Sequence, residues 1–206
     1  MDELRLEKFR ISDLKRIRNI FCEAFELQCY GDSGFVLRHL LDHYLCGYLM
    51  EADYAIKACS ENGIEGFLFG CSGKRGGNPV YAFLKAYNRL FLPVSGGGRA
   101  YNRCKQLIDD ADAALRRAAP PPESELLLFV VRAESRGRGV GRFMLADFKN
   151  WLLNQGIKRM QLFTDNWSDV DYYRDRGYEQ LGVEYIEFFP GDESEFYLFA
   201  IDVNDI

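Results

Sequence analysis

The hydrophobic positions of this chain follow a helical period in its first part and strand-like runs in its last part. Residues 14–25 place apolar side chains at intervals of three and four, and residues 36–45 do the same, so both stretches are predicted to be helices. A short alternating segment, 4–9, precedes them. Two apolar runs within 53–73 flank Glu61-Asn62-Gly63, and an Asn-Gly step between strands predicts a β-hairpin.

The pattern from residue 126 onward is strand, helix, strand, helix, strand, strand. Leu126–Val131 is a nearly continuous apolar run, which is typical of a central strand buried on both faces. A helical stripe follows over 140–152, then a strand at 159–165 and a short helix at 168–177. Residues 183–203 contain two strands around Pro190-Gly191-Asp192 and predict a second hairpin.

Residues 74–123 interrupt this order. They contain two glycine-rich breaks, a proline run, and two stretches (80–92 and 101–118) that we expect to be helical. At 206 residues the chain has room for one full-sized domain. We therefore expect a single domain, 1–206, with a helical insertion at about 74–123.

Composition narrows the classes of function. The net charge of −5 argues against general nucleic-acid binding. The six cysteines form no CxxC pair and several lie in apolar runs, which is typical of reduced, buried thiols in a cytoplasmic protein. The sequence has no secretory signal pattern and no apolar run of about 18 residues, so we expect neither export by that route nor a membrane span. His39 and His43 have a metal-binding spacing but no third ligand nearby, so no metal site is expected.

A glycine-rich loop joins the central strand to the next helix. Its glycines are Gly137, Gly139 and Gly141. A Walker A loop would need glycine, then Lys-Ser/Thr, at the position of Arg142, and a dinucleotide fingerprint would need its third glycine at that same position. The remaining pattern, R-x-x-G-x-G from Arg136, still predicts an anion site, because glycines let backbone N–H groups at a helix N-terminus approach a phosphate. Arg136, Arg138 and Arg142 add cationic donors.

The segment V-R-A-E-S-R-G-R-G-V-G resembles motif A of the GNAT superfamily of acyl-CoA-dependent N-acetyltransferases. In that family this loop holds the pyrophosphate of coenzyme A, and a backbone position of the preceding strand, here Val131, pairs with the pantetheine arm. The resemblance implies a set of cofactor-binding residues in the strand, loop and helix start: Val131, Arg136, Gly137, Arg138, Gly139, Val140, Gly141 and Arg142.

A second segment, N-W-S-D-V-D-Y-Y-R-D-R-G-Y, resembles the family's motif B. Asn166 lies seven residues before Tyr173, and Tyr173 lies four before Gly177, as in the family, while Tyr178 replaces the usual Phe. The resemblance implies that Asn166 and Tyr173 belong to the cofactor site. It also implies an α/β (α+β) fold with a mixed, largely antiparallel sheet of six or seven strands flanked by helices. Two central parallel strands, ending near Val131 and Thr164, would splay to admit the pantetheine arm.

The implied activity is transfer of an acetyl group from acetyl-CoA to an amine by direct attack. Tyr173 is the implied general acid, since a phenol within reach can protonate the leaving thiolate, and Tyr172 is the fallback. For a general base, Glu125 shares the strand parity of Leu127, Phe129 and Val131, and Glu134 lies closer to the loop. A water chain is the alternative, so no base is assigned.

The acceptor and the oligomeric state, monomer or homodimer, remain open at this point. The aromatic residues of the insertion are expected to cover the acceptor side as a lid, or else to form an accessory layer or dimer contact. Alternatives to the enzyme are a catalytically inactive CoA-binding regulatory module and an interaction module. The protein's acidity mildly favours a cationic acceptor.

Overall fold

The computed structural model describes residues 4–30, 34–73, 77–94, 96–168 and 170–206. Within these residues, seven strands form one sheet in the order β1-β2-β3-β4-β5-β7-β6. The strands are β1 (Arg5–Lys8), β2 (Tyr54–Ser60), β3 (Gly63–Cys71), β4 (Glu125–Val131), β5 (Arg159–Asp165), β6 (Glu179–Phe189) and β7 (Asp192–Asp202). All neighbours pair antiparallel except β4 and β5, which are parallel.

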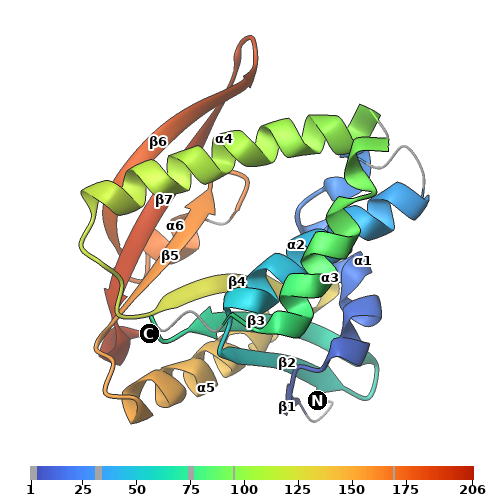
Figure 1. Cartoon of the computed structure of the whole chain (residues 1–206). Helices are drawn as coiled ribbons and strands as arrows, with labels where there is room; N and C mark the ends of the chain where they lie inside the picture. Colours follow the sequence, from blue (N-terminus) through green and yellow to red (C-terminus); the bar gives the residue numbers. More distant parts are fainter. Residues whose placement is uncertain (1–3, 31–33, 74–76, 95, 169) are drawn as a thin grey trace.

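Helices cover the sheet on both faces (Figure 1). The α-helices are α1 (Leu14–Ala24), α2 (Gly34–Glu51), α3 (Pro79–Arg89), α4 (Gly96–Ala118), α5 (Val140–Asn154) and α6 (Val170–Arg174). α1 and α2 pack on one face and α5 packs on the other, while the long α4 runs alongside the β6–β7 hairpin. Among the described residues, every helix is too short or too polar to cross a membrane.

The expected fold class is confirmed: a mixed, mostly antiparallel seven-stranded sheet flanked by helices. The hairpin turn expected at Glu61-Asn62-Gly63 lies between β2 and β3, and Gly63 has a positive φ of 118°. The second hairpin joins β6 and β7 around Gly191. Residues 74–123 contain α3 and α4, and Asn78 caps α3 by accepting a hydrogen bond from the Val80 N–H.

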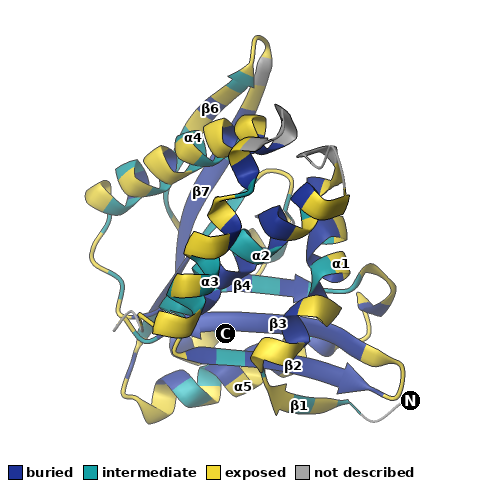
Figure 2. Ribbon diagram, turned by 45° about the vertical axis from the view of Figure 1, so that its right-hand side comes forward, coloured by how far each residue is buried: buried dark blue, intermediate teal, exposed yellow. Residues whose placement is uncertain are grey.

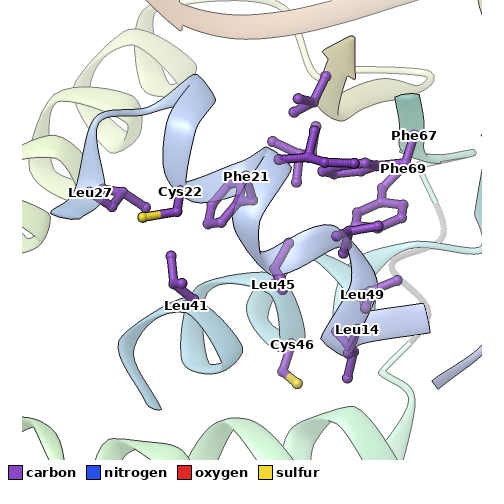
Figure 3. Close-up of a cluster of buried hydrophobic side chains, with 14 of the residues drawn as sticks. Leu14, Phe21, Cys22, Leu27, Leu41, Leu45, Cys46, Leu49, Phe67 and Phe69 are labelled. Atoms are coloured by element: carbon purple, nitrogen blue, oxygen red, sulfur yellow. The ribbon is translucent and has the colours of Figure 1, made fainter. Parts of the chain in front are cut away.

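The sheet separates two hydrophobic clusters. The first lies between the sheet and α1 and α2, where Phe21 of α1 and Leu45 of α2 pack near Phe67 and Phe69 of β3 (Figure 3). The second lies under α5 and contains Met144, Phe148 and Phe199. In Figure 2 strands β3 and β4 are largely buried, whereas α3 and α4 show exposed outer faces. The near-continuous apolar run of β4 is therefore explained by helices on both of its faces.

The parallel pairing of β4 and β5 is short. It comprises Glu125 with Gln161 and Leu126 with Leu162, extended at one end by a 2.9 Å hydrogen bond from the Gln161 N–H to the Ser124 carbonyl. Beyond Leu126, β4 keeps its ladder with β3 and β5 keeps its ladder with β7. The two strands therefore diverge toward their C-terminal ends, as the expected splay requires.

A β-bulge breaks the alternation of β4. Phe69 pairs with Leu128 while the next residue, Gly70, pairs with Leu126, so one residue of β4 has no opposite partner in β3. As a result Leu127 and Leu128 both pack toward the α1–α2 side, whereas Phe129 and Val131 face the α5 side. The expected common parity of Glu125 with Phe129 and Val131 is wrong, because that expectation assumed an unbroken period of two.

Candidate active site

The glycine loop lies at the C-terminal end of β4, where it turns the chain into α5. Gly137 and Gly139 have φ values of 73° and 83°, a left-handed conformation that side chains with a Cβ rarely adopt. Gly139 is the N-cap of α5 and has no side-chain cap; the first helical bond recorded at this end runs from the Phe143 N–H to the Gly139 carbonyl at 3.0 Å. The first-turn N–H groups of Val140, Gly141 and Arg142 precede it. This geometry presents backbone donors and the positive end of the helix dipole.

A buried carboxylate supports the loop from beneath. Glu65 of β3 is 5% exposed and accepts hydrogen bonds from the hydroxyls of Ser60 and Ser135, the latter at 2.5 Å. Ser135 ends the short turn that leads into the glycines, and the Arg132 N–H donates to the Glu65 carbonyl at 2.9 Å. These hydroxyl donors hold the pKa of Glu65 below its usual range, against the opposing effect of burial. The sequence reasoning missed Glu65, since its role depends on contact between residues 70 positions apart.

The predicted cofactor-binding side chains surround this turn. Arg136, Arg138 and Arg142 are exposed, and the Arg136 Nε donates to the Val131 carbonyl at 3.4 Å. A Cβ at Gly141 would lie 3.0 Å from the ring of Phe129, so a small residue lets α5 pack closely on β4. Asn166 lies apart from the loop at the end of β5, where its side-chain oxygen accepts from the Glu195 N–H at 3.2 Å.

A cavity of about 190 Å³ occupies the divergence between β4 and β5. Its walls come from both strands, from α1, α2 and α4 on one side, and from α6 and the β6–β7 hairpin on the other. Four residues of α4 contribute to it: Tyr101, Cys104, Lys105 and Ile108. The aromatic residues of α3 are not among its described lining residues. Within the expected insertion, α4 thus lines the cavity and α3 packs against α2.

Tyr173 projects from α6 into the lining of this cavity. Its ring stacks on Phe199 of β7 at 5.9 Å between centroids and meets Tyr178 edge-on at 5.2 Å. Tyr172 packs edge-on against it but lies outside the lining, with the Arg176 guanidinium 3.7 Å from its ring centroid. Gly177, with φ of 76°, ends the turn that follows α6. The fold thus places Tyr173, and not Tyr172, at the cavity.

Comparison with known proteins relates the segment that contains the loop and Tyr173 to a protein family. Residues 97–178, from α4 through Tyr178, match the model of the acetyltransferase (GNAT) family. The segment that contains the glycine loop and Tyr173 therefore carries the pattern of this family. This match begins inside the segment expected to be an insertion, so it includes the helix α4 that lines the cavity.

Solved structures show the same GNAT fold at low sequence identity. PH1933 from Pyrococcus horikoshii OT3 has a TM-score of 0.62 at 15% identity, over 97% of this chain and 98% of that one. The ribosomal-protein-S18-alanine N-acetyltransferase from Escherichia coli has a TM-score of 0.55 at 11% identity, over 98% and 94%. An N-acetyltransferase from Staphylococcus aureus Mu50 has a TM-score of 0.55 at 10% identity, over 98% and 99%.

One curated relative has clearer sequence similarity. The uncharacterized protein ML0378 of Mycobacterium leprae (strain TN) is 32% identical over 79 residues, which is 38% of this chain. The match spans only 21% of that protein's length. It therefore supports a shared segment and not a shared activity of the whole proteins.

Asp165 is a second residue of the candidate site that the sequence reasoning missed. It ends β5 and lines the cavity. Its Oδ1 accepts hydrogen bonds from the Trp167 N–H at 3.2 Å and from the Ser168 N–H and hydroxyl, both at 2.9 Å. Burial raises the pKa of Asp165, and these hydrogen bonds only partly oppose the shift. The Ser168 hydroxyl, just before α6, thus donates to Asp165.

The general-base candidates lie away from the cavity. Glu125 is 3% exposed and pairs with Arg116 of α4 at 2.7 Å, and it is not among the described lining residues. Glu134 is exposed and pairs with Arg132 at 3.5 Å. Both carboxylates therefore have cationic partners outside the cavity.

His39 and His43 each contact neighbouring residues of the fold. His39 is buried, lies 2.6 Å from the Asn88 side-chain oxygen and stacks on Phe91. The His43 Nδ1 lies 2.9 Å from the Lys85 carbonyl, and burial lowers the pKa of His43. Among the described residues, no group of three His, Cys, Asp or Glu side chains is placed to hold a metal ion.

Proposed function

We propose that this protein is an N-acetyltransferase that uses acetyl-CoA and an amine acceptor. The observation that carries the proposal is the divergence of β4 and β5 beyond Leu126 and Leu162, with the glycine loop at one side and the cavity at the other. The match of residues 97–178 to the acetyltransferase (GNAT) family supports it.

The loop residues fit a diphosphate group. Gly137 and Gly139 have no heavy atom within 4 Å of the position a Cβ would take, so the backbone there is open to a ligand. Val140, Gly141 and Arg142 would donate backbone hydrogen bonds, and Arg136 and Arg138 would add charge at the exposed rim. Val131 and Asn166 complete the proposed cofactor site at the two strand ends. Bound acetyl-CoA would supply the activated acetyl thioester.

Tyr173 is proposed as the general acid. The acceptor nitrogen forms a bond to the acetyl carbon, the carbon–sulfur bond breaks, and the Tyr173 hydroxyl gives its proton to the sulfur. The nitrogen loses a proton to water, and the Tyr173 phenolate regains one from solvent. The chain's own contribution is to position this hydroxyl, since Phe199 and Tyr178 pack against the ring from two directions.

The test is a combined binding and turnover assay on the full chain. Thermal shift and calorimetry with coenzyme A report the donor site, and release of free thiol from acetyl-CoA with an amine panel reports transfer. We expect CoA to stabilise the protein and at least one amine to accelerate thiol release. Binding of CoA without transfer to any amine would support an inactive regulatory module, and absence of CoA binding would support an interaction module.

A further inference from the structure

The cavity has a composition that selects among amines. Half of its described lining residues are aromatic, and they come from elements on both faces of the sheet, including Phe21, Tyr44, Tyr101, Trp167 and Phe196. Aromatic side chains offer large flat surfaces to an apolar body and electron-rich faces to a cation. A cavity built this way is poorly suited to a long polycation, whose several ammonium groups would lose water without gaining partners.

The described lining contains one carboxylate, Asp165, and one ammonium group, Lys105. The Lys105 ammonium pairs with Asp109, which lies outside the lining, and is 5.8 Å from the centroid of the Tyr44 ring. Every hydrogen bond recorded for Asp165 in the described residues comes from a neutral group, the N–H and hydroxyl donors of Trp167 and Ser168. All three go to Oδ1, so Oδ2 is the oxygen on which an incoming cation would be received.

The tyrosines on the opposite wall remain uncharged. Burial and the neighbouring Tyr44, followed by the charge of Asp165, raise the pKa of Tyr48 well above its usual range. Burial likewise raises the pKa of Tyr101. Among the described lining residues, Asp165 is thus the anionic group, and the tyrosines beside it are neutral.

The volume of the cavity is comparable with the volume of a small ligand. An apolar cavity of about 150 Å³ holds one benzene molecule, and sites for drug-sized ligands span roughly 300–1,000 Å³. At about 190 Å³, this cavity matches one aromatic ring with a short chain.

We propose that the acceptor is a primary amine on a short chain attached to an aromatic or similarly compact apolar body, bound with its ammonium group at Asp165 and its body against the aromatic walls. This inference rests on the proposed function, because it assigns the acceptor of that same site. The ammonium would form a charge-assisted hydrogen bond with the carboxylate in a partly desolvated position. It would give one proton to water before the neutral nitrogen attacks the acetyl carbon.

The experiment measures binding separately from catalysis. Phenethylamine, 2-phenylethanol (the ring without the charge) and spermidine (charges without the ring) are titrated by calorimetry into the full chain saturated with coenzyme A, so that no transfer occurs. We expect phenethylamine to bind at least tenfold more tightly than either of the others. Equal or tighter binding of spermidine would overturn the inference.

The Asp165→Asn variant tests the role of the charge. Asparagine keeps the Oδ1 acceptor for Trp167 and Ser168 and removes only the negative charge. We expect the preference for phenethylamine over 2-phenylethanol to fall to about one in this variant. The control is Asp171→Asn on α6, which removes the same charge from an exposed position outside the lining and should keep the full preference. An unchanged preference in Asp165→Asn would contradict the assignment.

Turnover then separates the two proposals. Tight, Asp165-dependent binding of phenethylamine without acetyl transfer would refute the proposed function and leave the ligand class standing. Efficient acetyl transfer to spermidine or a lysine peptide, with no preference for phenethylamine, would uphold the function and refute the ligand class.

Discussion

The proposed donor and acceptor sides of the β4–β5 divergence have different structures. The proposed donor side consists of consecutive backbone groups, from Val131 through Arg142, with cationic side chains at the rim. The proposed acceptor side consists of side chains from elements far apart in the sequence, and Asp165 is the carboxylate among its described lining residues. A backbone site of this kind suits a ligand part that does not vary, whereas a side-chain cavity can differ between proteins of one fold.

The same contrast applies to two carboxylates, the buried Glu65 and the half-buried Asp165. Glu65 lies under the loop, and the hydroxyls of Ser135 and Ser60 lower its pKa. Asp165 lies in the cavity, where burial raises its pKa. The first carboxylate is stabilised by the protein itself. Burial disfavours the charged form of the second carboxylate, and a bound cationic ligand would offset that cost.

The largest expected effect concerns the tyrosine between the two sides. Removing the hydroxyl in Tyr173→Phe should lower kcat by about 10²–10³-fold, within the range for loss of one general acid. Coenzyme A binding should be unchanged, because the ring packing on Phe199 is kept. Steady-state kinetics and calorimetry on the same preparation measure the two quantities.

Tyr172→Phe is the matched control for that substitution. Tyr172 is the neighbouring residue on α6 and packs against Tyr173, but it does not line the cavity. It should keep turnover within about threefold of the wild type, since a general acid must reach the reacting atoms. Equal losses in both variants would indicate disruption of α6 and would remove the general-acid assignment.

The next effect concerns the backbone of the glycine loop, where we propose that coenzyme A binds. Gly139→Ala should weaken coenzyme A binding at least tenfold, because alanine disfavours φ of 83° and places a Cβ where the ligand would lie. Gly156→Ala is the control at the opposite end of α5: its φ is 74° and its Cβ position is equally open. Both variants should lose similar stability, about 1 kcal/mol. Similar loss of CoA affinity in both would show that strain, and not the loop, is responsible.

The same contrast explains what sequence reasoning achieved. The loop was predictable because its glycines, arginines and helix start are adjacent in the chain, and Tyr173 followed from its spacing to Asn166 and Gly177. The fold class was predictable because the strand and helix periods are clear. The cavity was not predictable, because α4 meets β6 and β7 only in three dimensions, so no local pattern marks Asp165 as a cavity residue.

The bulge in β4 shows a second limit of sequence reasoning. Leu126, Leu127 and Leu128 are identical in type, so the run contains no signal for which residue lacks a partner. The close contacts of Gly70 reveal the reason on the neighbouring strand: a Cβ there would lie 2.4 Å from the ring of Phe148 and 3.2 Å from the Glu125 carbonyl. Packing across the sheet, and not the local sequence, sets the register.

A smaller effect concerns Glu65, the carboxylate beneath the glycine loop. Glu65→Gln should lower the free energy of unfolding at pH 7 by about 1.5–3 kcal/mol, the range for hydrogen bonds to a charged group. Because the folded pKa of Glu65 is below the unfolded value, its contribution is present above the unfolded pKa and is lost as pH falls through the folded pKa. Denaturant unfolding at neutral and acidic pH should therefore show a difference from wild type that shrinks with acidification. A constant difference would exclude the carboxylate charge as its source.

The smallest expected effect is the change in stability of the Asp165→Asn variant, and it distinguishes Asp165 from Glu65. Asp165→Asn keeps the hydrogen bonds at Oδ1 and removes a charge that burial disfavours, so it should leave stability at pH 7 unchanged or raise it by up to about 1 kcal/mol. Because the folded pKa of Asp165 is above the unfolded value, the wild type gains stability as pH falls through the folded pKa, and the advantage of the variant should shrink there. Unfolding curves at several pH values measure this difference. A loss of stability above about 1 kcal/mol would show that Asp165, like Glu65, stabilises the fold. Unchanged stability together with a lost preference for the amine would show that Asp165 serves ligand binding.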